Sequence, residues 1–314
     1  MTSEPTHPTP TIRDRLEGAV WGHLAGDALG VPYEFRMPEG IETVEFRGGG
    51  GHGQPPGTWS DDGALMLALL DSLTSAGFDP EDQGRKALAW ADSGAYAPGT
   101  TVFDIGGATS TAMRHLRKGV AAVNAGPSGE HDCGNGSLMR ILPVALVGRD
   151  LSDAELVARA QIASRVTHGH PRPQVACALY VLIARDLLRG ETDTAAILEA
   201  CTARYRSVPE AHLEALEELI ARRSKVRYGA GYVLDTFWSA WEAFTGAASY
   251  REAVIAAVKY GHDADTTACI TGGLAGIRWG IDGVAEEWLV QMRGREIAEP
   301  LVRRLVDLAS EPMP

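Results

Sequence analysis

The sequence predicts an all-α fold, because three features favour helices over sheets. Apolar residues recur at the spacing of amphipathic helices along most of the 314-residue chain. Several segments open with helix-capping patterns, of which Ser152-x-x-Glu155 is an example. The alternation typical of a strand is confined to residues 43–47, and no internal repeat or Pro/Ser-rich linker divides the chain. We therefore expect one helical domain whose acidic loops lie at helix starts.

Composition and charge exclude several classes of protein. Hydrophobic residues make up 45% of the chain, which is enough for a substantial core and excludes a disordered protein. The net charge of −12 argues against a protein that binds nucleic-acid backbones in general. It does not argue against a small ligand that carries phosphate, because helix N-termini and metals neutralise phosphate locally.

The absence of a membrane-spanning run and of paired cysteines predicts the cellular compartment of the protein. The longest uncharged apolar run, residues 175–184, is too short to span a bilayer, so no membrane association is expected. The four cysteines lie far apart without a C-x-x-C pair, as in cytoplasmic proteins with reduced thiols. Residues 1–10 are polar and Pro-rich and are expected to be a disordered lead-in. Residues 11–314 are expected to form the domain, as a cytoplasmic monomer.

The helices can be followed from the N-terminus. Ile12, Leu16, Val20 and Leu24 recur every four residues and predict the first helix, which runs into GDALGVPYEF at residues 26–35. Further helices are predicted where similar spacing follows a polar or Gly-rich start, over residues 65–73, 107–116, 152–166, 175–188, 211–223, 232–244, 249–261, 265–277, 284–292 and 297–308.

Particular residues mark some of these helix boundaries. Ser207-x-x-Glu210 is interpreted as a capping box that opens the helix over residues 211–223. Residues 167–174, THGHPRPQ, are expected to break the chain between two helices. Within this break His168 and His170 are interpreted as a pocket-lining ring and a loop histidine, in preference to metal ligands.

Residues 48–57, GGGGHGQPPG, are predicted to be a loop. Four consecutive glycines have no side chains to pack, and the prolines stop regular structure. No Gly-Lys-Ser/Thr follows, so the segment is not a P-loop. Two interpretations stay open, a flexible connector and a lid over a site that begins just after it.

Residues 261–280, GHDADTTACITGGLAGIRWG, carry the strongest chemical signal. Asp263, Asp265 and Thr266 offer only oxygen ligands, which suits Mg²⁺ or Mn²⁺ better than zinc. The small apolar residues that follow predict a buried helix whose glycines let a neighbouring backbone come close. Alone, this pattern would also fit a capped helix start with solvated carboxylates.

A second acidic helix start strengthens the metal hypothesis. Ser60, Asp61 and Asp62 stand directly before an apolar run with helical spacing. Adjacent aspartates repel each other, and a divalent ion would remove that repulsion. Two such starts, far apart in sequence, predict a site for two metals that share bridging carboxylates.

Weaker signals lie between these two motifs. Glu34 stands between aromatic residues and is either a partly buried acid–base carboxylate or a surface residue after a turn. Asp104 precedes Gly106 and Gly107 at a helix start, which is a plausible anion site. In residues 132–146, the run CGNGS exposes backbone N–H groups and polar side chains that fit either a ligand edge or an ordinary turn.

The motifs GDALGVPYEF, WSDDG, FDIGG, GNGSLMR and GHDADTTACITGGLAG, in this order, resemble those of the ADP-ribosylglycohydrolase family. The resemblance covers most of the chain, and it implies a single compact orthogonal helical domain with a cleft for two Mg²⁺ or Mn²⁺ ions. It implies six metal ligands, which are Ser60, Asp61, Asp62, Asp263, Asp265 and Thr266.

The resemblance also implies roles for the remaining candidates. Glu34 would lie near the first metal, and Asp104 would be the catalytic carboxylate. The ADP-ribose pocket would be lined by residues from three segments, namely Gly106, Gly107, Asn135, Gly136, Ser137 and His168. The family usually has Thr on both sides of the Asp pair, whereas this chain has Ser60 and Gly63. The loss of a hydroxyl at Gly63 puts metal preference in doubt.

By this resemblance the expected function is hydrolysis of the bond between ADP-ribose and protein arginine, with metals orienting the distal ribose and water and with Asp104 or Glu34 assisting. Serine, a nucleic-acid base or O-acetyl-ADP-ribose are alternative acceptors. A non-catalytic ADP-ribose binder is a different class, which the intact metal aspartates disfavour. A metal-dependent phosphohydrolase would add histidine ligands, and His262 is the only histidine in either metal motif.

Overall fold

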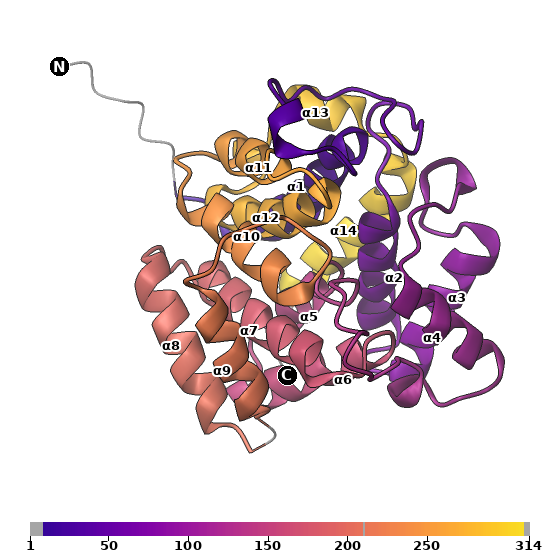
Figure 1. Cartoon of the computed structure of the whole chain (residues 1–314), viewed down its shortest axis with the longest axis vertical. Coiled ribbons are helices and arrows are strands. Elements are labelled where there is room, and N and C mark those ends of the chain that lie inside the picture. Colours follow the sequence, from indigo (N-terminus) through magenta and orange to yellow (C-terminus); the bar gives the residue numbers. More distant parts are fainter. Residues whose placement is uncertain (1–8, 210, 311–314) are drawn as a thin grey trace.

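The computed structural model describes residues 9–209 and 211–310, which fold almost entirely into helices joined by short loops (Figure 1). The α-helices are α1 (Ile12–Gly30), α2 (Asp61–Ser75), α3 (Pro80–Ser93), α4 (Gly107–Arg117), α5 (Leu142–Val147), α6 (Asp153–Arg165), α7 (Pro171–Leu188), α8 (Thr194–Ser207), α9 (Leu213–Arg222), α10 (Val233–Thr245), α11 (Tyr250–Val258), α12 (Ala264–Trp279), α13 (Glu286–Gln291) and α14 (Arg295–Ser310). The described residues contain no strand, and the predicted all-α class is confirmed.

Several predicted boundaries differ from the structure. The alternation in residues 43–47 forms no strand. The capping box at Ser207 was wrong, because Ser207 is the last residue of α8 and α9 begins only at Leu213. Its partner Glu210 lies outside the described residues, as do residues 1–8 of the expected lead-in. Helix α7 begins at Pro171, four residues before the predicted start at residue 175. Proline is favoured at the first helical position because the N–H that it lacks would have no partner in the first turn.

Helices α3, α5 and α8 are additional to the prediction, and two of them have a clear N-terminal cap. Asp79 caps α3 by accepting from the Glu81 N–H, and Pro80 occupies the first helical position. Asp193 caps α8 by accepting from the N–H groups of Ala195 and Ala196. Both starts carry the Asp or Asp-Pro signal that favours a helix N-terminus.

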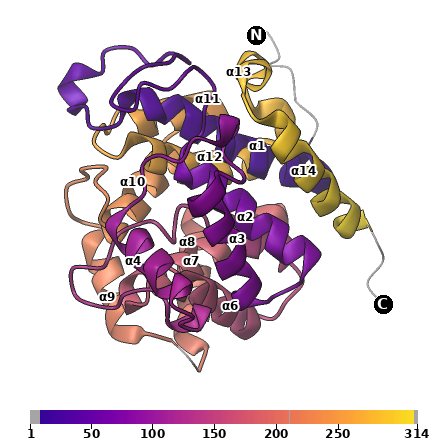
Figure 2. The same cartoon turned by 90° about the vertical axis from the view of Figure 1, so that its right-hand side faces the viewer.

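Helices α1 and α12 pack backbone to backbone at the centre of the molecule (Figures 1 and 2). A Cβ atom built on Gly18 would lie 2.3 Å from the Gly276 carbonyl oxygen, and one on Gly22 would lie 2.6 Å from that of Gly272. A Cβ on Gly26 would lie 2.4 Å from the Ala268 carbonyl oxygen. Glycines at every fourth position of α1 therefore place the two backbones in contact, as the small-residue run predicted.

The close contact of α1 and α12 makes Gly276→Ala an expected destabilising change. Its Cβ would lie 1.9 Å from the Gly18 carbonyl oxygen, so one backbone must shift. Overpacking of this kind costs about 1–3 kcal/mol or more. Gly84→Ala in α3 is the matched control, because its Cβ would meet only side-chain carbons at 3.1 Å or beyond. Urea unfolding should give a lower midpoint for Gly276→Ala than for Gly84→Ala, and equal midpoints would contradict the backbone contact.

The other helices surround this pair. Helix α7 is buried from Pro173 to Leu188, and helix α2 is buried over most of its length, so both belong to the core. Helices α3 and α4 lie together beside α2, whereas α8 and α9 lie against α7 (Figures 1 and 2). None of the helices in the described part of the chain has the length and apolarity needed to cross a membrane.

The antiparallel pairing of α1 and α12 positions the predicted site. A Cβ on Gly30, the last residue of α1, would lie 2.3 Å from the Asp265 Cα in the first turn of α12. The end of α1 therefore meets the start of α12, and the 3₁₀ turn Val31–Tyr33 then delivers Glu34 beside it.

Candidate metal-binding active site

The two acidic helix starts meet in the structure. Ser60 caps α2, because its hydroxyl accepts from the Asp62 N–H at 3.2 Å and donates to the Asp62 carboxylate at 2.8 Å. The Thr266 hydroxyl, in the first turn of α12, donates to the same carboxylate at 3.4 Å. Residues more than 200 positions apart thus share one cluster, which was the main expectation drawn from the two motifs.

Asp27 of α1 belongs to the same cluster and was not among the predicted site residues. Its side chain is fully buried and accepts from the Ser60 N–H at 3.0 and 3.1 Å and from the Gly63 N–H at 2.8 Å. It therefore binds the start of α2 to α1. The available signal was a carboxylate inside a helix whose neighbours, Gly26 and Ala28, are small and buried.

The cluster is strongly acidic. Seven carboxylates surround it, and in the described part of the chain none of them pairs with Lys or Arg: they are Asp27, Glu34, Asp61, Asp62, Asp104, Asp263 and Asp265. Burial, followed by the neighbouring carboxylates, raises the pKa of Glu34 to about 10. Burial likewise raises the pKa of Asp27 and of Asp104 to about 7.

The deepest carboxylates are shifted in the same direction. Burial first, and then repulsion from Asp62, holds the pKa of Asp61 well above its ordinary value. Burial and the charge of Glu34 do the same for Asp265, and burial and the charge of Asp27 for Asp62. A positive charge among these groups would remove both penalties.

The donor set fits hard divalent cations. Oxygen atoms from three carboxylates lie within 4.8 Å of one another in three groups that share Asp62 and Asp265, which are Asp27/Asp62/Asp265, Glu34/Asp263/Asp265 and Asp61/Asp62/Asp104. One oxygen of Asp265, Oδ2, is buried and has no hydrogen-bond partner among the residues that the structure describes. A buried, unpartnered carboxylate oxygen among other carboxylates is the arrangement that a cation would satisfy. The residues could therefore hold divalent metal ions.

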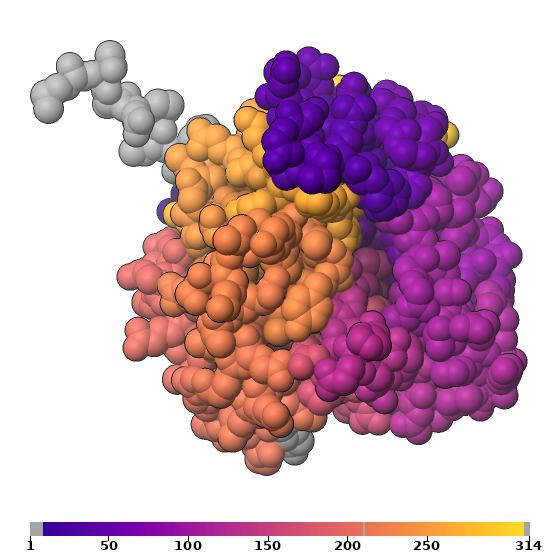
Figure 3. All heavy atoms as spheres, viewed as in Figure 1, coloured from indigo at the N-terminus to yellow at the C-terminus, as the bar shows by residue number. Residues whose placement is uncertain are grey.

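A cavity of about 390 Å³ opens onto this cluster. In the space-filling view the surface is hollowed where the N-terminal, magenta and orange segments meet (Figure 3). Ten of the predicted residues line the cavity, namely Glu34, Asp61, Asp104, Gly106, Gly107, Asn135, Gly136, His168, Asp263 and Thr266. Ser60, Asp62 and Asp265 lie buried behind its acidic wall.

The rest of the cavity wall is rich in glycine and carries one further carboxylate, Asp132. Helix α4 starts at Gly107 without a side-chain cap, so its first N–H groups remain available to a ligand anion. The Asn135 amide donates to Asp263 at 2.8 Å, which links this wall to the acidic cluster. A Cβ on Gly136 would lie 2.8 Å from the His168 ring, so glycine makes room for the ring. Burial lowers the pKa of His168 to about 3, and the ring is neutral.

Ser137 differs from the expectation. It is fully buried outside the cavity wall, and its hydroxyl accepts from the Ser164 hydroxyl at 2.8 Å and from the Cys177 thiol at 3.4 Å. The GNGS turn thus presents Asn135 and Gly136 to the cavity, and it uses Ser137 to anchor itself to α6 and α7.

The packing around Gly63, which follows the aspartate pair, explains why this position is occupied by glycine. A Cβ on Gly63 would lie 2.8 Å from both the Leu24 side chain and the Trp59 ring. The Trp59 indole is fully buried, and its N–H donates to the Tyr96 carbonyl at 2.9 Å. The space that a larger side chain would need is therefore filled by tryptophan.

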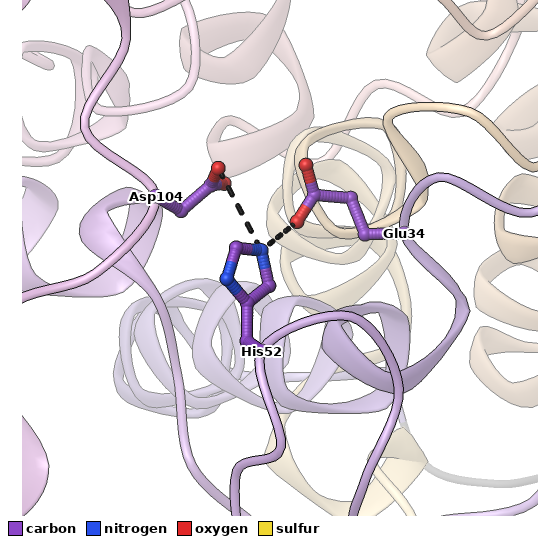
Figure 4. Close-up of side chains that lie close together, drawn as sticks. All are labelled: Glu34, His52 and Asp104. Atoms are coloured by element: carbon purple, nitrogen blue, oxygen red, sulfur yellow. Dashed lines mark hydrogen bonds and ion pairs between the residues drawn. The ribbon is translucent and has the colours of Figure 1, made fainter.

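His52, from the Gly-rich loop, is a second residue that the sequence reasoning missed. Its Nε2 contacts the Glu34 carboxylate and lies 3.7 Å from the Asp104 carboxylate (Figure 4). Burial lowers its pKa, which favours the neutral ring. A single histidine at the centre of a glycine run was the signal for it.

Known proteins resemble this chain along nearly its whole length. An ADP-ribosylarginine hydrolase of Pseudomonas putida is 31% identical, over 95% of this chain and 79% of that protein. The ADP-ribosyl-[dinitrogen reductase] glycohydrolase of Rhodospirillum rubrum is 29% identical, over 95% of this chain and 96% of that protein. The ADP-ribosylhydrolase ARH3 of Danio rerio is 26% identical, over 94% and 90% of the two chains.

Solved structures and a family model agree. A chain described as an ADP-ribosylglycohydrolase-related protein complex superposes with a TM-score of 0.79 at 31% identity, covering 95% of this chain and 99% of that one. The family model for ADP-ribosylglycohydrolase matches residues 8–314. With five sequence motifs assembled around one acidic cavity, this protein belongs to the ADP-ribosylglycohydrolase family of hydrolases.

Proposed function

We propose that this protein hydrolyses the glycosidic bond between ADP-ribose and an arginine side chain of a modified protein, and that it uses two Mg²⁺ or Mn²⁺ ions. The observation that carries the proposal is the division of the cavity wall. Seven clustered carboxylates and the Thr266 hydroxyl lie at one part of the cavity, whereas the uncapped start of α4, several glycines, the neutral His168 and a single carboxylate, Asp132, line the remainder. A molecule with sugar hydroxyls at one end and a diphosphate and base at the other matches this division.

The six predicted oxygen ligands, together with Asp27, would hold the cations. Bound there, divalent cations would supply positive charge that fixes the hydroxyls of the distal ribose and orients a water molecule. Asn135 would keep Asp263 in position through the hydrogen bond from its amide. The first N–H groups of α4, beside Gly106 and Gly107, would bind the diphosphate.

Asp104 and Glu34 are the proposed catalytic carboxylates. Both line the cavity and both approach His52, so they lie together at one place in the wall. Cleavage of a glycosidic bond passes through an oxocarbenium-like state, which a nearby carboxylate stabilises, while a carboxyl group transfers the proton. Two carboxylates at the same place can divide these tasks between them.

Arginine is the acceptor that two lines of support favour. The relatives from Pseudomonas putida and Serratia proteamaculans are named as ADP-ribosylarginine hydrolases. An acidic cavity also attracts a cationic guanidinium more strongly than a neutral serine O-glycoside or a base. The relative named ARH3 is described only as an ADP-ribosylhydrolase.

Release of ADP-ribose from matched peptides tests this proposal. Arginine-linked and serine-linked ADP-ribosyl peptides should be compared side by side with Mg²⁺, Mn²⁺ or EDTA. We expect release from the arginine peptide only, and only with metal. Release from the serine peptide alone would correct the acceptor, and equal release in EDTA would contradict the use of metals. Silence on both peptides, with ADP-ribose still binding by calorimetry, would favour a binding role.

A further inference from the structure

The Gly-rich loop, residues 48–57, is an ordered turn that lies against residues 32–35, the segment that carries Glu34. The Gly49 N–H donates to the Gln54 carbonyl at 2.8 Å, which closes the turn. A Cβ on Gly50 would lie 2.6 Å from the Pro32 backbone, and one on Gly51 would lie 2.9 Å from the Phe35 ring. The glycines therefore permit close approach to residues 32–35, and the turn presents His52 at its tip.

His52 contacts both segments that carry the proposed catalytic carboxylates. Its ring lies between the rings of Phe35, which follows Glu34, and Phe103, which precedes Asp104 (Figure 4 shows His52 with the two carboxylates). The ring centroids are 5.4 Å apart on the Phe35 side and 5.0 Å apart on the Phe103 side.

Both catalytic segments also contain an unfavourable backbone conformation at this point. Phe35 has φ +63° and Asp104 has φ +62°, values that side-chain-bearing residues adopt at a cost. Such conformations persist only where the surroundings fix them. The His52 ring contacts the Phe35 ring, and its Nε2 lies 3.7 Å from the Asp104 carboxylate.

We propose that His52 is a positioning residue that fixes Glu34 and Asp104 relative to each other, which makes the Gly-rich loop a part of the active site. A neutral imidazole has one N–H to donate, so at Nε2 it can hold Glu34 directly and keep Asp104 close by. The direct contact between Nε2 and the Glu34 carboxylate makes His52 a hydrogen-bond partner of this carboxylate. This role rests on the function proposed above.

Replacing the ring by glycine, with imidazole as a chemical rescue, tests the positioning role. His52→Gly should lower kcat about 10–100-fold, because a small misplacement of reacting groups costs rates of this order. KM should change less than about threefold, since the wall that takes ADP-ribose is left intact. Added imidazole should restore part of kcat by filling the space between Phe35 and Phe103. His52→Gln, which keeps a donor, should lie between the wild type and His52→Gly.

A second histidine provides the matched control. His170 also lies near a carboxylate, at 3.7 Å from Glu130, but it caps α7 outside the cavity. His170→Gly should keep the wild-type kcat and show no response to imidazole. A wild-type kcat in His52→Gly, or a loss that imidazole and glutamine both fail to restore, would overturn the proposal.

Amide hydrogen exchange separates this proposal from the proposed function. In His52→Gly, exchange should become faster in residues 48–57, 34–36 and 101–106 together, and it should stay unchanged in α7. A wild type that releases no ADP-ribose from any peptide would refute the proposed function, and exchange would still test the contact. Unchanged exchange in residues 34–36 and 101–106 would overturn the positioning role whatever the activity.

Discussion

Asp265→Asn is expected to abolish hydrolysis while leaving the metal-free protein at least as stable as the wild type. Asp265 is fully buried in the first turn of α12, and within residues 9–209 and 211–310 its Oδ2 has no hydrogen-bond partner. Asparagine keeps the size but removes a ligand charge. Even residues that only support metal ligands cost about 10–100-fold when replaced, so a direct ligand should cost at least that much. The same change removes a buried carboxylate that Glu34, Asp62 and Asp263 repel.

Asp71→Asn is the matched control with the opposite expectation. Asp71 lies in α2 away from the cavity, and Lys86, Tyr96 and Arg304 all donate to its carboxylate. These partners lower its pKa, so its charge stabilises the fold. Asp71→Asn should lower Tm and leave turnover intact. Calorimetric metal binding, Tm in EDTA and turnover should be measured for both variants. Unchanged metal affinity in Asp265→Asn would contradict the cluster as the cation site.

The sequence could predict those parts of the fold that depend on residues close together in the chain, such as helix caps and runs of small residues. Ser152 caps its helix as its capping pattern indicated. The small residues from Ala268 to Gly276 predicted a close backbone contact, and this contact was found. These residues could not identify the partner helix, because the partner is specified by glycines at the matching four-residue spacing in α1. In the sequence, glycines at that spacing are equally compatible with a loop or with the end of a helix.

The candidate site likewise contains residues that local motifs predicted and residues that only the tertiary structure identified. Asp61 and Asp265 were identified because two carboxylates stand together at each helix start, a pattern with a chemical meaning of its own. Asp27 and His52 reach the cluster through tertiary contacts that no local pattern records, Asp27 with the start of α2 and His52 with Glu34. Ser137 shows the reverse case, because a polar residue in a ligand-binding turn can face the core. Sequence patterns identify residue chemistry, whereas the direction of a side chain is set by packing.

In EDTA, the stability of this protein is expected to fall as pH rises from 5 to 8. Unfolded carboxylates lose their protons near pH 4, whereas burial keeps the pKa of Asp27 and Asp104 at about 7 and that of Glu34 at about 10. The folded state therefore binds more protons in this window, and stability decreases with pH. The rise in the pKa of Asp27 alone, from 3.8 to about 7, corresponds to a loss of unfolding free energy on the order of 4 kcal/mol as the pH rises between these two values.

Mg²⁺ or Mn²⁺ should reverse this trend, because cations compete with protons for the same oxygens and bind more tightly as pH rises. Their stabilisation, RT ln(1 + [L]/Kd), is therefore expected to grow from pH 5 to pH 8. Thermal unfolding across this range, with EDTA or with metal, measures both slopes. Asp27→Asn should flatten the EDTA slope, whereas Asp71→Asn should leave it unchanged because the pKa of Asp71 lies below this window. A Tm in EDTA that is constant or rises with pH would contradict the cluster, since uncompensated buried carboxylates must favour the protonated, low-pH form.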